Sequence, residues 1–243
     1  MSPAMQFFLV LILSLFLSSG YAASTTSLKE RMVKGKPGDF VVTAQGSNYS
    51  VLTIRENIGG RFVLEEITVP QASFNAEKTP WKEWVARRAP GHSSWMGYSF
   101  DMENNTLRQC YSYSQRQWIF IEKSDHLLAQ ILTMNLKPTP ERDRKRIGPP
   151  PFAGEMDRRK LWLPQMVANG MKVTCPRYEI VRAVWPQDKT RLAGCVVELY
   201  FDSRRTEFPF PYWLEIQSPH YTFKMRAIDS GEGLQSPMPL LLE

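Results

Sequence analysis

Alternation of apolar and charged side chains near the C-terminal end constrains the fold most strongly. Residues 207–226 read EFPFPYWLEIQSPHYTFKMR, and the second part alternates with the two-residue period of a β-strand. With a tight turn at Pro219-His220, Glu215 faces Lys224 as an opposite-charge pair. A shift of one residue would move every side chain to the other face. The stretch therefore predicts a β-hairpin with one apolar face and one charge-paired face.

The apolar face of this hairpin is the candidate ligand-binding surface. Pro209 and Pro211 cannot donate to a strand ladder, so this end of the hairpin should lie at a sheet edge or a rim. An aromatic strand that enters at a rim suits a concave, ligand-binding sheet, and it also suits the edge of an ordinary β-sandwich. The candidate ligand-binding residues are Phe210, Tyr212, Leu214, Ile216, Phe223 and Met225, together with Trp81 and Trp84 from an expected helix.

Strand-like patterns fill most of the rest of the chain. Asp39–Pro70 contains three runs rich in β-branched and aromatic residues, separated by turn residues. Thr79–Arg88 and Ser124–Lys137 change to a helical period of apolar residues. A further hairpin is expected with a two-residue turn at Asn104-Asn105. Its register would pair Asp101 with Arg108 and collect Met96, Tyr98, Phe100, Tyr111 and Tyr113 on one face.

These patterns predict an α+β fold that is mainly antiparallel β. The expected architecture is a curved sheet with a few covering helices. Residues 23–229 are expected to form a single β-rich domain, and residues 230–243 an irregular C-terminal tail. Hydrophobic residues make up 43% of the chain, which is enough to build a core of this size.

Residues 137–160 form an expected loop of unusual composition within this domain. The segment holds five prolines, eight basic and four acidic residues, so its net charge of +4 accounts for most of the chain's +6. It is either a solvated connection or a surface that docks anionic lipid headgroups or an acidic partner. The candidate docking residues are Arg142, Arg144, Lys145 and Arg146.

Residues 1–22 are predicted to be a signal peptide. Phe7–Leu17 is an eleven-residue apolar run, too short to span a bilayer comfortably, and small residues at Gly20 and Ala22 suit cleavage after Ala22. The segment before the run has no Lys or Arg, and an uncleaved N-terminal anchor is the alternative. The mature chain is therefore expected to be exported, either periplasmic or secreted.

The three cysteines argue against a simple disulfide framework, because an odd count leaves at least one thiol unpaired within the chain. A hairpin around Gln187–Lys189 would pair Cys195 with Val181 and place Cys175 too far from Cys195 for a disulfide, unless Pro176 turns the chain back.

No catalytic, metal or cofactor site is expected. The three histidines, His92, His126 and His220, lack the spacing of a zinc site, and no nucleophile or pair of carboxylates can be given a catalytic role. Nucleic acid is an unsuitable partner for an exported chain without a recognised binding motif.

An exported basic chain of antiparallel strands with a few helices resembles the periplasmic lipoprotein carriers (Lol-type) and related half-barrel lipid-binding proteins. The likeness is one of pattern. It rests on the opening strands DFVVTAQGSNYSVLTIRENIGGRFVLEE, the two helices and the late strands GCVVELYFD, FPFPYWLEI and HYTFKMRAID. The resemblance implies an open half-barrel whose concave face holds acyl chains.

Two functions follow as hypotheses. The first is an exported binding protein for lipid or lipidated protein in the cell envelope, for which an anionic membrane surface is a further possible partner. The second is a non-enzymatic structural or interaction protein with a filled core. The oligomeric state is left open.

Overall fold

The computed structural model describes residues 27–76, 78–120, 124–188 and 190–241. The predicted signal peptide, residues 1–22, lies outside the described residues. The helices are α2 (Leu28–Met32), α3 (Trp81–Ala86) and α4 (Ser124–Thr133), with short 3-10 turns η1 (Gln71–Ser73) and η2 (Glu141–Asp143). Within the described part of the chain, no helix is long and apolar enough to cross a membrane.

The strands form one large antiparallel sheet and one small hairpin. The large sheet contains β1 (Phe40–Gln45), β2 (Asn48–Ile58), β3 (Arg61–Pro70), β4 (Ser94–Asp101), β5 (Thr106–Ser112), β6 (Gln117–Trp118), β7 (Lys137–Pro138), β10 (Tyr178–Val184), β11 (Val196–Asp202), β12 (Trp213–Gln217) and β13 (Thr222–Gly231). The small hairpin consists of β8 (Val167–Ala168) and β9 (Met171–Lys172).

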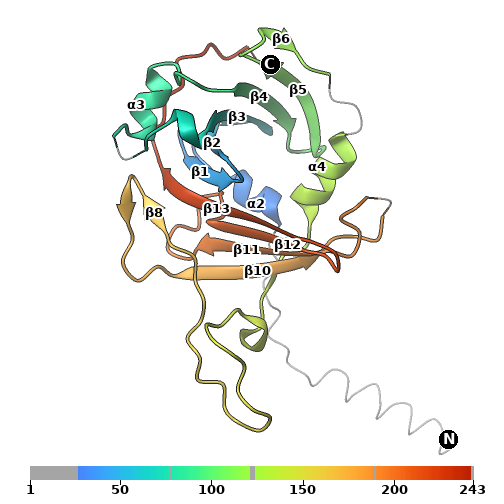
Figure 1. Cartoon of the computed structure of the whole chain (residues 1–243). Coiled ribbons are helices and arrows are strands. Elements are labelled where there is room, and N and C mark those ends of the chain that lie inside the picture. The colour runs from blue at the N-terminus through green and yellow to red at the C-terminus, as the bar shows by residue number, and fades with distance from the viewer. Residues whose placement is uncertain (1–26, 77, 121–123, 189, 242–243) are drawn as a thin grey trace, which may run out of the picture.

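The large sheet is strongly curved and open. Its order is β6-β5-β4-β3-β2-β1-β13-β12-β11-β10-β7, so β6 and β7 are its edges. Figure 1 shows the sheet curled around α2, with α4 at the open side of the curl and α3 outside it. The predicted α+β class, with a curved, mainly antiparallel sheet and few helices, is confirmed.

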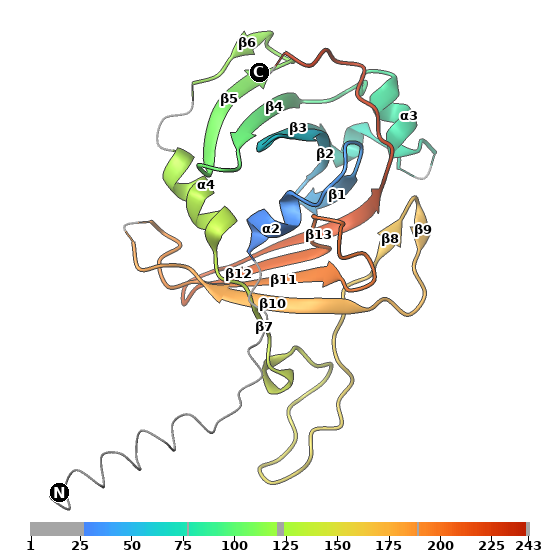
Figure 2. The same cartoon turned by 180° about the vertical axis from the view of Figure 1, so that it is seen from behind.

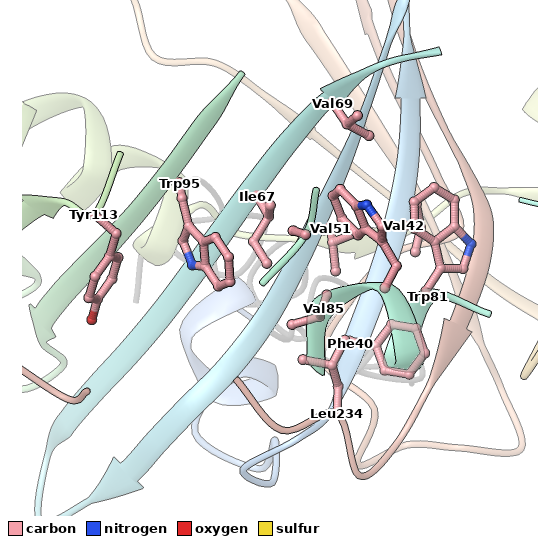
Figure 3. Packing of buried hydrophobic residues seen from close by; sticks show 12 residues of the cluster. Phe40, Val42, Val51, Ile67, Val69, Trp81, Val85, Trp95, Tyr113 and Leu234 are labelled. Carbon is pink, nitrogen blue, oxygen red and sulfur yellow. The ribbon is translucent and has the colours of Figure 1, made fainter. Parts of the chain in front are cut away.

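Curvature gives the sheet two distinct faces. We call the side that holds α2 and α4 the inner face, and the side that α3 covers the outer face. Outer-face residues of β1 to β5 pack against the tryptophans of α3 (Figure 3). This cluster contains Phe40, Val42, Val51, Ile67, Val69, Trp81, Trp84, Val85, Ala89, Trp95, Tyr113 and Leu234.

The β12–β13 hairpin has the predicted register. Glu215 lies opposite Lys224, and the backbone of Ser218 bonds to that of Tyr221 across the turn. Regular pairing begins at Trp213, after the two prolines. The strand β12 itself lies inside the sheet, between β11 and β13. The two prolines allow this because they precede its paired residues and therefore remove no hydrogen bond from the ladder.

The β4–β5 hairpin differs from the prediction at its turn. Asp101 pairs with Thr106, so residues 102–105 form the turn rather than Asn104-Asn105 alone. The Asp101 carboxylate accepts backbone hydrogen bonds from the turn at 2.9 and 3.0 Å. It also forms an ion pair with Arg108, although the two residues are not opposite each other as predicted. The shift separates the five residues expected on one face: Met96, Tyr98 and Phe100 lie on the inner face, and Tyr111 and Tyr113 on the outer.

The register predicted for the β10–β11 hairpin was wrong. Val181 pairs with Leu199 rather than with Cys195, because the connection spans residues 185–195. The Trp185 amide closes it by donating to the Cys195 carbonyl, and the Gly194 amide donates to the Trp185 carbonyl. Cys110, Cys175 and Cys195 are all free in the structure.

The C-terminal tail begins later than predicted and is held by the sheet. β13 continues to Gly231, so residues 230 and 231 belong to a strand. Leu234 is buried in the outer-face cluster, and the Tyr113 hydroxyl donates to the Pro239 carbonyl at 2.9 Å. The tail is irregular, but it covers part of the outer face.

Candidate functional site

The inner face has a buried floor. Val41, Ile54, Phe62 and Ala227 are almost inaccessible there, and they pack with residues of the two inner helices, Met32 of α2 and Leu132 of α4. This floor lies at the centre of the sheet, where the first and last strands, β1 and β13, are neighbours.

Two groups of apolar residues on the same face remain partly exposed. The first group comes from β2 to β5 and the second from the β12–β13 hairpin. Because the sheet is curled, the two groups lie on opposite sides of the curl (Figure 1). The first group is Leu52, Leu64, Met96, Tyr98, Phe100 and Leu107. The second is Leu214, Ile216, Phe223 and Met225. We call these ten residues the inner apolar groups.

The helix α2 is fixed inside the curl. Arg31 is buried, forms an ion pair with Glu179 of β10, and places its guanidinium 4.0 Å from the centre of the Phe201 ring. After the helix ends, the Asn57 side chain donates to the Gly35 carbonyl at 2.7 Å. Contacts to both halves of the sheet make α2 part of the inner face rather than a loose cover.

One polar pair interrupts the first inner apolar group. The Tyr98 hydroxyl donates to Glu66 at 3.2 Å, and both residues are partly buried. Burial, followed by the charge of Glu66, raises the pKa of the Tyr98 hydroxyl, so it stays a neutral hydrogen-bond donor. The inner face therefore offers a mainly apolar surface with a polar point on one side.

The structure separates the eight predicted ligand-binding residues into three sets. Leu214, Ile216, Phe223 and Met225 are partly exposed on the inner face. Phe210 and Tyr212 are buried in the floor cluster, so they support the face rather than present it. Trp81 and Trp84 lie on the opposite side of the sheet, in the outer-face core.

Trp81 also lines a hollow on the outer side. This hollow of about 570 Å³ lies between α3, β13 and the β8–β9 hairpin, and Phe40 and Ile228 contribute to its wall. It is separated by the sheet from the inner apolar groups, so the predicted residues do not form one site.

The four predicted docking residues have different environments. Lys145 contacts Glu198 and Glu215 of the outer face, Arg146 contacts Asp157, and Arg144 donates to a backbone carbonyl. Arg142 alone of these four is strongly exposed. Three of the four therefore hold the loop together or attach it to the sheet.

The histidines described by the structure have structural or exposed positions. His92 bonds to the Ala89 carbonyl at 2.9 Å and packs against Trp95, and His220 is exposed in the β12–β13 turn. Among the described residues, no group of three His, Cys, Asp or Glu side chains could hold a metal ion.

Sequence reasoning missed part of the inner face. Leu52, Leu64 and Leu107 alternate with outer-face residues in the usual way, so their strands were predictable. Their place opposite the β12–β13 hairpin depends on the curl of the sheet, which periodicity does not specify.

Comparison with known proteins places the chain in a family. The family model of the CT021 protein matches residues 50–174, just over half of the 243 residues. The chain belongs to this family. The match runs from β2 to just beyond β9, so it includes the first inner apolar group and the basic loop.

The fold is also similar to a solved structure. The hypothetical protein CT021 from Chlamydia trachomatis, solved at 2.0 Å resolution, has a TM-score of 0.65 and 18% sequence identity, over 90% of this chain and 99% of that chain. At this identity the likeness concerns the fold alone. A search of the curated proteins found no match.

Proposed function

We propose that this protein binds an extended apolar ligand, the acyl chain of a lipid or of a lipidated protein, against the inner face of its sheet. The single observation that carries the proposal is the partial exposure of the inner apolar groups. Apolar side chains that face the inside of a curved sheet normally become buried by packing, and here ten of them stay partly exposed, in two groups on either side of α2.

The arrangement of the inner helices supports an elongated ligand. α2 lies over the central floor and is attached to both halves of the sheet, while the inner apolar groups lie on either side of it. An acyl chain could contact either group without entering the floor. The Tyr98–Glu66 pair gives a possible contact for a polar headgroup.

We further propose that the chain is exported and acts in the cell envelope, in the periplasm or after secretion, as a lipid-binding or lipoprotein-transport protein. The support for this part is the Phe7–Leu17 apolar run and the small residues that follow it. N-terminal sequencing of the exported protein should begin at Ala23 or close to it, whereas an intact Met1 on a cytosolic protein would contradict export.

Ligand binding can be tested with two inner-face variants and a matched control. Phe223→Ala and Leu214→Ala each remove a partly exposed inner-face side chain, and Tyr111→Ala removes a partly buried outer-face aromatic from the same sheet. A fluorescent fatty-acid probe should bind the wild type. Each inner-face change should weaken that binding by roughly fivefold, or about 1 kcal/mol of apolar contact, and Tyr111→Ala should not.

Mass spectrometry of the purified wild type should also detect co-extracted lipid. If the wild type takes up no apolar probe and carries no lipid, or if Tyr111→Ala weakens probe binding as much as Phe223→Ala, the binding proposal is wrong. The structural or interaction protein with a filled core would then replace it.

A further inference from the structure

The segment between β7 and β8 forms an arm that projects from the sheet. We call residues 141–161 the arm; Figures 1 and 2 show it extending away from β10 on the side opposite α2. Its two strands approach each other at the base, where Arg146 forms a β-bridge with Leu161 and the Ile147 amide donates to the Lys160 carbonyl at 2.9 Å. The arm is therefore a hairpin-like projection.

The base of the arm is attached firmly to the outer face. Lys145 lies between Glu198 and Glu215, and its ammonium is 5.6 and 5.8 Å from the ring centres of Trp162 and Trp213. Arg182 of β10 adds a 2.7 Å ion pair with Asp143. These contacts hold the near end of the arm in one position on the sheet.

A second set of contacts stiffens the middle of the arm. Asp157 accepts hydrogen bonds from Arg159 and lies 3.4 Å from Arg146. The hydrogen bond from Arg159 is the main cause that lowers the pKa of Asp157 to about 2, so the carboxylate stays charged at any ordinary pH. Arg159 also donates to the Gly148 carbonyl at 2.9 Å, which ties the two strands together.

The far end of the arm is apolar and exposed. Phe152 and Met156 have exposed fractions of 84% and 79%, and Ile147, next to the base, has one of 58%. Pro149–Pro151 restrict the backbone between them. Single exposed apolar residues are common, but three large ones on a stiffened projection form a contact surface.

Positive charge surrounds this apolar end. The side chains of Arg142, Arg158 and Lys160 are exposed along the arm. The arm holds seven basic and four acidic residues, so its net charge is +3. An apolar tip with basic flanks complements the interface of an anionic membrane, where headgroups are negative and acyl chains lie just beneath.

We propose that the arm docks on an anionic lipid bilayer, with Phe152 and Met156 entering the boundary between headgroups and acyl chains and the basic flanks contacting the headgroups. This inference goes beyond ligand binding by the inner face, because the arm lies on the other side of the sheet and shares none of the inner apolar groups.

A dye placed at the tip provides a local test in the full chain. Phe152→Cys is labelled with an environment-sensitive fluorophore in a Cys175→Ser background, since Cys175 is the exposed cysteine and Cys110 and Cys195 are buried. Vesicles containing phosphatidylglycerol should increase the emission and shift it to shorter wavelength. Phosphatidylcholine vesicles should not. Ile58→Cys, labelled in the same way at an exposed apolar position at the end of β2, outside the arm, is the control and should show no shift.

The charge contribution is tested with Arg142→Glu and Arg158→Glu together, which should weaken the vesicle response at position 152 at least tenfold. The same variant should keep the wild-type affinity for the fatty-acid probe, so failure of one proposal is distinguishable from failure of the other. No response at position 152, or equal responses at positions 152 and 58, would overturn membrane docking and would leave the tip free to contact a protein.

Discussion

Neighbouring residues on the two faces of the same strands have different degrees of burial. On the outer face Val51, Ile67 and Trp95 are almost completely buried beneath α3 and the C-terminal tail. Leu52 and Met96, one position further along β2 and β4, point to the inner face and stay partly exposed. The same alternation of apolar residues thus builds a closed core on the outer side, whereas the inner side combines a buried floor with ten side chains that stay partly exposed. The burial of a face therefore depends on the elements that cover it rather than on its amino-acid composition.

The largest expected effect comes from opening the outer-face core. Trp84 has an exposed fraction of 2%, packs against Phe74 and Trp81, and donates from its indole nitrogen to the Pro90 carbonyl at 3.0 Å. Trp84→Ala should lower the free energy of unfolding by about 3–5 kcal/mol, because it removes packing and leaves a cavity. Urea denaturation measures this directly.

The difference in packing between the two faces is tested by comparing the losses of stability in Trp84→Ala and Phe223→Ala. Phe223 is only partly buried, so its loss should cost about 1 kcal/mol of stability. Equal losses for the two variants would mean that the inner face is as closely packed as the outer one.

An effect at the lower end of that range for Trp84→Ala is expected from a buried ion pair that holds the tail on the outer face. Arg55 contacts Glu65 at 2.7 Å and donates to the Met238 carbonyl at 2.9 Å. Arg55→Met leaves the buried Glu65 without its cation and should cost about 3 kcal/mol of unfolding free energy. The matched control is Arg87→Met, which breaks an exposed pair with Glu83 and should cost less than about 1 kcal/mol. Similar costs would show that the outer face is less closed than its burial indicates.

The smallest effect is a pH dependence of stability. Burial, partly offset by Arg55, raises the pKa of Glu65 in the folded protein above its ordinary value of 4.5. The folded state therefore binds this proton more readily than the unfolded state, and stability increases as pH falls through the raised pKa toward 4.5. Glu65→Gln should lack this increase. The free energy of unfolding, measured in urea between pH 7 and 4.5, should therefore differ between wild type and variant by an amount that changes with pH. Parallel plots of this free energy against pH would contradict the raised pKa of Glu65.

Local pairing was largely predictable from the sequence, whereas long-range placement was not. The β12–β13 register followed from charge pairing across a short turn, and the mainly antiparallel β class followed from the many alternating segments. The turn between β4 and β5 was predicted at the wrong residues, because Asn104-Asn105 suggested a two-residue turn. In the structure, Asp101 accepts hydrogen bonds that stabilise a four-residue turn. The β10–β11 register failed because eleven residues, 185–195, form the connection.

The candidate site was predictable only in part for the same reason. Leu214, Ile216, Phe223 and Met225 belong to one hairpin, and their common face is a local property. Trp84 has the same apolar character, but the path of the chain around the sheet carries it to the outer face. Lys145 likewise resembled a free surface cation until the fold placed Glu198 and Glu215 beside it.

The adjacency of β1 and β13 has a consequence for how the chain folds. Strands β1 to β6 and strands β10 to β13 each pair mainly with sequence neighbours, but the two halves of the sheet meet where Phe40–Ala44 pair with residues near the end of the chain, up to Gly231. Closing so long a loop is slow, and during synthesis the N-terminal half exists first. Until β13 arrives, β1 offers an unpaired edge to other chains. The order of strands therefore favours late joining of the two halves and makes aggregation through β1 the main hazard of folding.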